Sequence, residues 1–256
     1  MNDWPLPSSL PFSLPFPLPF WIAHRGAGKL APENTLAAFR LGAQFGYRAF
    51  ECDVKLSSDG QPFLLHDDDL DRTTNASGPA DARSWSELAG LDAGGWHSRM
   101  FTGEPPASLA AVARFVIANR LALNLELKPN PGQARLTGQV VGREVLRLWQ
   151  DCPTPPLLSS FELDALEGAL DAAPSLPRGL LLEHLHAGWL AQAQALGCCA
   201  VITHHPLMAP QVVAQIHAAG MKALVYTVND AATAQALQAS GVDGVITDAV
   251  DQFAPA

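Results

Sequence analysis

The sequence predicts one large domain built as a (β/α)8 TIM barrel, and three observations carry that prediction. The chain has 256 residues, a length that suits one barrel. Beyond residue 20, short runs rich in Val, Ile and Leu alternate with longer stretches rich in Ala and Leu. Charged residues gather where the early runs end, and parallel barrels carry their functional residues at that end of the strands.

Eight short apolar runs are the expected strands. They are Trp21–His24, Ala49–Val54, Leu121–Leu127, Pro156–Ser160, Gly179–Leu182, Cys199–Thr203, Lys222–Thr227 and Gly244–Thr247. Helical crossovers force consecutive strands to pair in parallel, so eight such units favour a closed barrel. A doubly wound open sheet is the alternative, and it gains little support because no GxGxxG motif follows the first run.

The first expected helix runs from Asn34 to Gln44. Asn34 is its expected N-cap, because a side-chain oxygen at that position accepts from the free amides of the first turn. Leu36 and Phe39 share its apolar face, and Gly46 is expected to close it.

Residues 1–20 form a proline-rich arm that precedes the alternation. The triplet Leu-Pro-Phe begins at Leu10, Leu14 and Leu18, and proline at this density excludes helix. We expect an extended strap packed on the protein's own surface. A dimer-forming or partner-docking arm is the alternative.

The barrel domain is expected to span residues 21–256, with one insertion at 71–107. This stretch follows the second expected strand and is polar and rich in Gly, Pro and Trp. Loops after barrel strands lie at the catalytic face, so the insertion predicts a cap over the site.

Composition narrows the classes of partner and compartment. A formal net charge of -9 argues against a nucleic-acid partner and against stable association with an anionic membrane. Neither a signal peptide nor an apolar run of about 18 residues is found, which favours a cytoplasmic protein. The four cysteines include an adjacent pair, Cys198 and Cys199, and are expected to be reduced thiols.

Ionisable side chains cluster around the ends of the first three expected strands. They are His24 and Arg25 after the first, Glu51 and Asp53 on the second, His66 just beyond it, and Glu126 and Lys128 on the third. Residues two apart in a strand point the same way. Glu51 therefore shares a face with Asp53, and Glu126 shares a face with Lys128.

Three of these groups are carboxylates: Glu51, Asp53 and Glu126. Carboxylates that converge on a barrel mouth repel one another unless they are protonated, paired with cations or bound to a metal. Their oxygens are hard ligands, which select one divalent cation such as Mg2+, Ca2+ or Mn2+.

The remaining groups suit phosphate chemistry. The Arg25 guanidinium can bind two phosphate oxygens, and the Lys128 ammonium adds a point charge. His24 and His66 supply imidazoles, the side-chain type whose ordinary pKa lies near neutrality, as proton transfer requires.

Five motifs in order give the chain a family resemblance. They are His24-Arg25-Gly26 with Pro32-Glu33-Asn34-Thr35, Glu51-x-Asp53-Val54, His66-Asp67-x-x-Leu70-x-Arg72-Thr73-Thr74, Glu126-x-Lys128, and Tyr226-Thr227-Val228-Asn229 with Thr247-Asp248. Together they resemble the glycerophosphodiester phosphodiesterase family over roughly residues 21–250. Segments 29–36 and 155–162 look especially like the bacterial cytosolic branch associated with glycerol-3-phosphate uptake.

The resemblance implies a role for each of these residues. It implies metal ligands at Glu51, Asp53 and Glu126, an acid/base pair at His24 and His66, and substrate contacts at Arg25, Lys128, Phe161 and Tyr226. Tyr226 stands where many family members carry Trp. The implied substrates are glycerophosphodiesters such as glycerophosphocholine and glycerophosphoethanolamine, with sn-glycerol 3-phosphate and an alcohol as products.

Several alternatives stay open from the sequence. Trp85, Trp96, Met100 and Phe101 in the insertion would suit a lysophospholipase D or phospholipase C-like activity on lipids. A non-catalytic binding barrel that uses the arm as its contact is a further alternative, and the arm could also join two copies as a homodimer. So is a metal-dependent enzyme acting on a carbonyl compound with Lys128 as base. Direct attack by water and attack by the glycerol 2-hydroxyl remain equally open as routes.

Overall fold

The structure is a computed structural model that describes residues 18–253 and 255. Residues 1–17, most of the proline-rich arm, lie outside this range, so the expected strap and its dimer-forming alternative are not described. Leu18, at the end of the arm, packs against the barrel interior near Ile22 and Gly244. Among the described residues, no helix is both long and apolar enough to cross a membrane.

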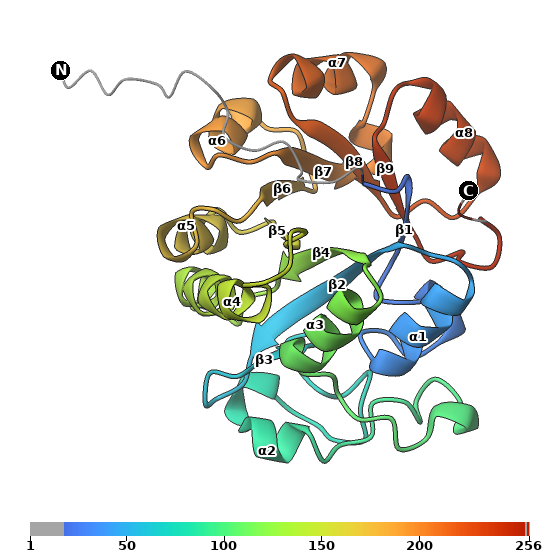
Figure 1. The fold of residues 1–256 in the computed structure, drawn as a ribbon, viewed down its shortest axis with the longest axis vertical. Coiled ribbons are helices and arrows are strands. Elements are labelled where there is room, and N and C mark those ends of the chain that lie inside the picture. The colour runs from blue at the N-terminus through green and yellow to red at the C-terminus, as the bar shows by residue number, and fades with distance from the viewer. Residues whose placement is uncertain (1–17, 254, 256) are drawn as a thin grey trace.

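Eight parallel strands close into a barrel, as the sequence predicts (Figure 1). The strands are β1 (Trp21–Ala23), β2 (Ala49–Leu56), β4 (Ala122–Leu127), β5 (Leu157–Ser160), β6 (Arg178–Leu182), β7 (Ala200–His204), β8 (Lys222–Tyr226) and β9 (Gly244–Thr247). Their order is β1-β9-β8-β7-β6-β5-β4-β2, and pairing of β1 with β2 closes the ring.

Helices cover the outside of the ring (Figure 1). The covering helices are α1 (Leu36–Gln44), α3 (Leu109–Ala118), α4 (Ala134–Leu148), α5 (Leu163–Ala172), α6 (Trp189–Ala195), α7 (Pro210–Ala218) and α8 (Ala231–Ala239). The short helix α2 (Trp85–Leu88) belongs to the insertion instead. Short 3-10 turns lie at Gly28–Leu30, Ala80–Ala82, Arg99–Phe101 and His205–Leu207.

The start of α1 corrects one expectation. Thr35, not Asn34, is the N-cap: its backbone is extended and its hydroxyl accepts from the amide of Ala38 at 3.2 Å. Asn34 instead has a positive φ of 60° and uses its side chain to bind Asp53. The sequence offers two good capping residues side by side, and the contact with Asp53 decides between them. Gly46, with φ of 92°, follows the helix end as expected.

Alternation along β2 decides which residues face the inside of the barrel. Ala49 belongs to the apolar cluster inside the ring, whereas Phe50 and Cys52 belong to the cluster between the strands and the helices. Since side chains two apart point the same way, Glu51 and Asp53 also point into the ring. The apolar cluster that contains Ala49 fills the barrel at the amino-terminal ends of the strands. Polar side chains occupy the barrel at the carboxyl-terminal ends.

Register brings the acidic residues of β2 and β4 together. In the parallel pairing, Glu51 is opposite Asn124 and Asp53 is opposite Glu126. β2 also runs to Leu56, two residues beyond the predicted end, because the short strand β3 (Pro62–Leu64) pairs with it antiparallel.

The insertion after β3 has a small core of its own. Phe63, Leu70 and Leu88 are buried together there, with Trp85 packed against them. Glu104 ties the insertion to the barrel by accepting from the amide of Ala37 in α1 at 2.9 Å. The insertion therefore lies beside β3 and α1.

Candidate active site

A pocket of about 440 Å³ opens at the carboxyl ends of the strands. Eight of the nine predicted site residues line it: His24, Arg25, Glu51, His66, Glu126, Lys128, Phe161 and Tyr226. The ninth, Asp53, lies beneath the pocket, where it contacts Arg25 and Lys128. Asn124, Leu181 and Glu183 also line the pocket.

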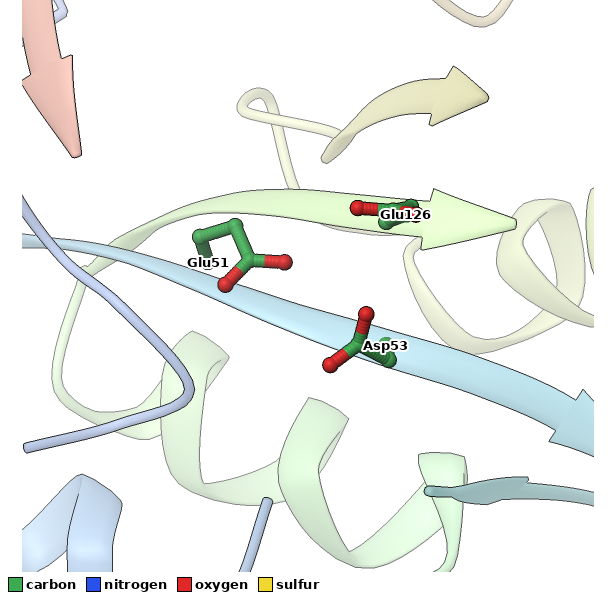
Figure 2. A group of neighbouring side chains, drawn as sticks. All are labelled: Glu51, Asp53 and Glu126. Atoms are coloured by element: carbon green, nitrogen blue, oxygen red, sulfur yellow. The ribbon is translucent and has the colours of Figure 1, made fainter. Parts of the chain in front are cut away.

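The three predicted carboxylates form one compact cluster (Figure 2). Glu51 and Asp53 come from β2 and Glu126 from β4, all three are buried, and one ligand atom from each lies within 4.8 Å of the others. Oε1 of Glu51 is buried without a hydrogen-bond partner in the described part of the chain. An orphaned carboxylate oxygen aimed into an all-oxygen cluster fits a hard divalent cation.

The cluster is electrostatically strained without a cation. Burial, with the nearby charge of Asp53, raises the pKa of Glu51 well above its usual range and raises the pKa of Glu126 to about 7. Burial acts in the same direction on Asp53. The charges of Arg25, His66 and Lys128 and a hydrogen bond from Asn34 outweigh it, so the pKa of Asp53 is lowered. A bound cation would remove the repulsion that the two glutamates feel.

Two cationic side chains border the carboxylates. Nε of Arg25 lies 3.3 Å from Oδ2 of Asp53, and Nζ of Lys128 lies 2.8 Å from Oε1 of Glu126. Burial lowers the pKa of both bases, but the surrounding carboxylates more than compensate and raise it. Both cations are therefore charged and face the pocket, where a phosphate would neutralise them.

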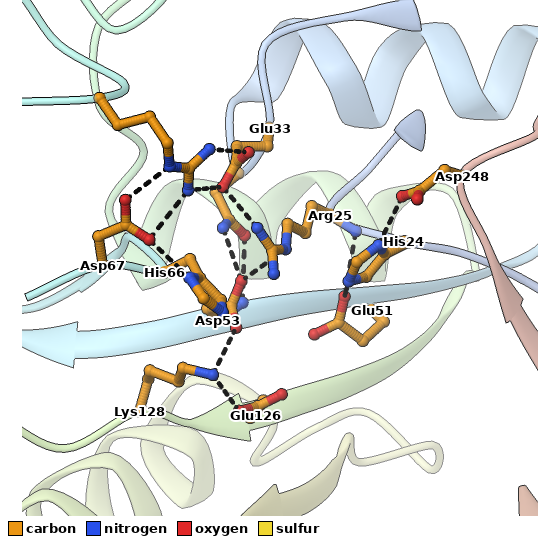
Figure 3. A network of polar contacts seen from close by, with 12 residues as sticks. His24, Arg25, Glu33, Glu51, Asp53, His66, Asp67, Glu126, Lys128 and Asp248 are labelled. Atoms are coloured by element: carbon orange, nitrogen blue, oxygen red, sulfur yellow. Dashed lines mark hydrogen bonds and ion pairs between the residues drawn. The ribbon is translucent and has the colours of Figure 1, made fainter. Parts of the chain in front are cut away.

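Each predicted histidine is held by an aspartate (Figure 3). Nδ1 of His24 lies 2.6 Å from Oδ1 of Asp248, and Nδ1 of His66 lies 2.7 Å from Oδ1 of Asp67. In both pairs the aspartate occupies Nδ1, so Nε2 is the nitrogen available to a substrate. Burial outweighs the nearby carboxylates at His66 and lowers its pKa, which favours the neutral, proton-accepting form.

The aspartates are themselves anchored, and the anchor of Asp67 reaches into the insertion. Arg72 donates to Asp67 at 2.6 and 3.0 Å and to Glu33 at 2.7 and 2.8 Å. Glu33 in turn accepts from Nη1 of Arg25 at 2.8 Å (Figure 3). The insertion thereby links the guanidinium of Arg25, which lines the pocket, to Asp67, the partner of His66.

Asp248 is anchored by Asn229. The Asn229 side chain donates to Oδ2 of Asp248 at 3.2 Å and accepts from its backbone amide at 2.8 Å. Both residues follow neighbouring strands, β8 and β9, so the parallel pairing brings them together.

Local backbone geometry turns the first motif toward the pocket. Arg25 has a φ of 51° and Gly26 a φ of 103°. A Cβ on Gly26 would lie 2.7 Å from that of Ala38, so only glycine fits against α1 there. The turn lets the backbone amide of Arg25 donate to Glu51 at 3.1 Å.

An aromatic wall completes the pocket. Phe161, after β5, packs edge-to-face on Tyr226 at the end of β8, with ring centroids 5.8 Å apart. The Tyr226 hydroxyl donates to the carbonyl of Leu182 at 3.2 Å, which fixes the ring. Nζ of Lys128 lies 5.6 Å from the Phe161 ring centroid.

Sequence reasoning assigned no role in the site to Asp67, Asp248, Glu33, Arg72 or Asn34, and it gave Asn34 only the role of a helix cap. All five lie inside the quoted motifs, which was the available signal. Their contacts depend on segments that are distant in the chain: His24 and Asp248 are 224 positions apart and Glu33 and Arg72 are 39 apart. No local pattern reveals such pairs.

The fold and the site together define a class: a parallel (β/α)8 barrel enzyme whose mouth combines a buried acidic cluster that could hold a metal ion with two basic side chains. The model of the glycerophosphoryl diester phosphodiesterase family matches residues 24–252. The chain belongs to this family and is a phosphodiesterase of that type.

Three relatives illustrate the similarity. YhdW of Bacillus subtilis is 33% identical over 90% of this chain and 94% of its own length. A glycerophosphodiester phosphodiesterase of Caldanaerobacter subterraneus subsp. tengcongensis is 30% identical, over 89% and 93%. A phosphodiesterase of Oleispira antarctica, solved in complex with the product sn-glycerol-3-phosphate, superposes with a TM-score of 0.86 at 35% identity and covers 92% of this chain and 95% of its own.

Proposed function

We propose that this protein hydrolyses glycerophosphodiesters to sn-glycerol 3-phosphate and an alcohol, with one divalent cation and two histidines. The observation that carries the proposal is the placement of the carboxylate cluster between two His–Asp pairs and two cationic side chains in one pocket. The Oleispira relative, solved with sn-glycerol-3-phosphate, supports the product.

Glu51, Asp53 and Glu126 would hold the cation. When bound, a divalent cation at this position polarises a phosphate oxygen and orients hydroxyl groups. The donor set consists of carboxylates alone, which favours Mg2+, Ca2+ or Mn2+ over zinc.

Arg25 and Lys128 bind the phosphate. Their charges lie on the pocket side of the carboxylates, and they stabilise the negative charge that spreads over the phosphoryl oxygens in the transition state. Glu33 holds the guanidinium in place, so little reorganisation is needed when the substrate binds.

His24 and His66 transfer the protons. One removes a proton from the attacking hydroxyl through Nε2, and the other protonates the oxygen of the leaving alcohol. Asp248 and Asp67 hold the Nδ1 tautomer and stabilise the imidazolium that forms. The same pair serves direct attack by water and attack by the glycerol 2-hydroxyl.

Phe161 and Tyr226 contact the carbon skeleton of the substrate. Their rings form the apolar wall of an otherwise charged pocket, which suits the carbon atoms on either side of the phosphate.

The test uses metal-stripped protein incubated with glycerophosphocholine, with and without added Mg2+, Mn2+ or Ca2+, followed by assay of glycerol 3-phosphate. Release that depends on metal supports the proposal. Release of the phosphorylated alcohol instead, or activity only on lysophosphatidylcholine micelles, would contradict the substrate assignment. No release with any diester and any cation would contradict the reaction.

A further inference from the structure

Glu183 is a carboxylate in the pocket that the proposed mechanism does not use. It follows β6, lines the pocket and is exposed. Glu51 and Glu126 are paired with pocket bases, but Glu183 has neither an ion pair nor a hydrogen bond within the described chain. A free carboxylate repels an anionic diester unless a positive group of the same molecule meets it.

Its position separates it from the guanidinium of Arg25. Three strands lie between β6 and β1 in either direction round the closed ring, so Glu183 is opposite His24 and Arg25. A substrate whose phosphate lies against Arg25 and Lys128 extends its other half toward the far wall. The pocket thus has a positive side and a negative side.

The negative side is also aromatic. Tyr226 lines the same pocket as Glu183; burial mainly, and the charge of Glu183 in addition, raise the pKa of Tyr226 to about 12. The phenol is therefore neutral, and its ring is fixed by the hydrogen bond to the carbonyl of Leu182. His204 extends the wall, with its ring centroid 6.0 Å from that of Tyr226. A carboxylate beside an aromatic face is a favourable environment for an ammonium group.

We infer that Glu183 and the Tyr226 ring bind a positively charged head group on the alcohol half of the substrate. The protein then prefers diesters of ammonium alcohols, such as choline or ethanolamine, over diesters of neutral alcohols. This preference rests on the proposed function. It fits the net charge of -9, because a zwitterionic substrate is repelled less than an anionic one.

The experiment compares two substrates that share the glycerophosphate half: glycerophosphocholine, with a cationic head group, and glycerophosphoglycerol, with a neutral one. KM and kcat are measured for the wild type, Glu183→Gln, Glu183→Lys and Glu162→Gln. Glu162 is the matched control, since it is a mouth carboxylate that lines a neighbouring hollow and not this pocket.

We expect Glu183→Gln to raise KM for glycerophosphocholine by about threefold to tenfold, as for one partly exposed charge contact, and to leave glycerophosphoglycerol within about twofold. Glu183→Lys should enlarge the difference by adding repulsion, and Glu162→Gln should leave both substrates unchanged.

Three results would overturn the inference alone: equal changes for both substrates, which would place Glu183 on the shared glycerol half; no change in either Glu183 variant; or the same effect in Glu162→Gln. A wild type that is inactive on both diesters with every cation would overturn the proposed function, and this inference with it.

Discussion

Nδ1 of His24 lies 2.6 Å from Oδ1 of Asp248, and this contact joins the first barrel strand to the last. Asn229 holds the aspartate in turn. Burial tends to raise the pKa of Asp248, but the contacts with His24 and Asn229 outweigh it and lower that pKa. Asp248 is thus ionised and positioned to hold the His24 ring in one tautomer, with Nε2 facing the pocket.

Asp248→Asn should lower kcat by about tenfold or more, and by no more than the roughly 10²–10⁴-fold that the general acid or base itself contributes. KM should change less, because Asp248 does not line the pocket. Nitrogen chemical shifts of His24 should report a mixed tautomer in the variant, and Asp248→Glu should recover part of the rate. An unchanged tautomer and rate would make the contact merely structural.

His24→Ala and His66→Ala should each lower kcat by about 10²–10⁴-fold while substrate affinity stays nearly intact. The proposed phosphate contacts of Arg25 and Lys128 use neither imidazole ring. His217→Ala is the control, since His217 is another histidine paired with an aspartate, Asp243 at 2.7 Å, but lies outside the pocket. Near wild-type turnover in both site variants would refute the acid/base assignment.

Glu51→Gln should weaken cation binding, and excess cation should partly restore activity. The amide keeps one oxygen but loses the charge that attracts the cation. Isothermal titration with Mn2+ gives the affinity, and Glu162→Gln should bind as the wild type does. Failure of every cation concentration to restore activity would count against a ligand role.

Cation affinity should rise with pH across neutrality. The pKa of Glu126 is raised to about 7 and that of Glu51 is raised as well, so cation binding must displace protons below this range. The raised pKa values also affect the free energy of unfolding of the cation-free protein. The protonated glutamates favour the folded state at low pH, and this stabilisation is lost as the pH rises through about 7. Calorimetry in two buffers of different ionisation enthalpy should detect proton release that is larger at pH 6 than at pH 8.

Arg72→Ala should destabilise the fold by about 1 kcal/mol at neutral pH, a small value because the Arg72 side chain is 44% exposed. Hydrogen bonds from Arg72 lower the pKa of Asp67, and with Arg25 they overcome burial to lower that of Glu33. Stabilisation from lowered carboxyl pKa values is complete above about pH 4.5 and is lost on acidification.

The stability difference between the wild type and Arg72→Ala should therefore shrink below about pH 4, as denaturant unfolding at several pH values would show. Turnover should also fall, because Asp67 loses its anchor beside His66. Arg147→Ala, which removes an exposed pair with Glu144, should leave the free energy of unfolding essentially unchanged at every pH. Equal, pH-independent losses in both variants would contradict this account.

The sequence by itself determined the architecture and the residue types of the site. Strands buried on both faces need continuous apolar runs, so the eight runs marked the eight barrel strands, with ends shifted by a few residues. Two-residue alternation was enough to assign Glu51 and Asp53 to one face. Both patterns depend only on residues that are neighbours in the sequence, so they can be read without knowledge of the fold.

Only the tertiary structure decided how these residues are held. Closure of the barrel brings His24 to Asp248, and folding of the insertion against α1 brings Arg72 to Glu33 and Asp67. The contact with Asp53 takes Asn34 away from the helix cap that its residue type predicted. Such choices depend on which distant groups arrive within hydrogen-bond distance, and that is a property of the packed chain, not of any segment of it.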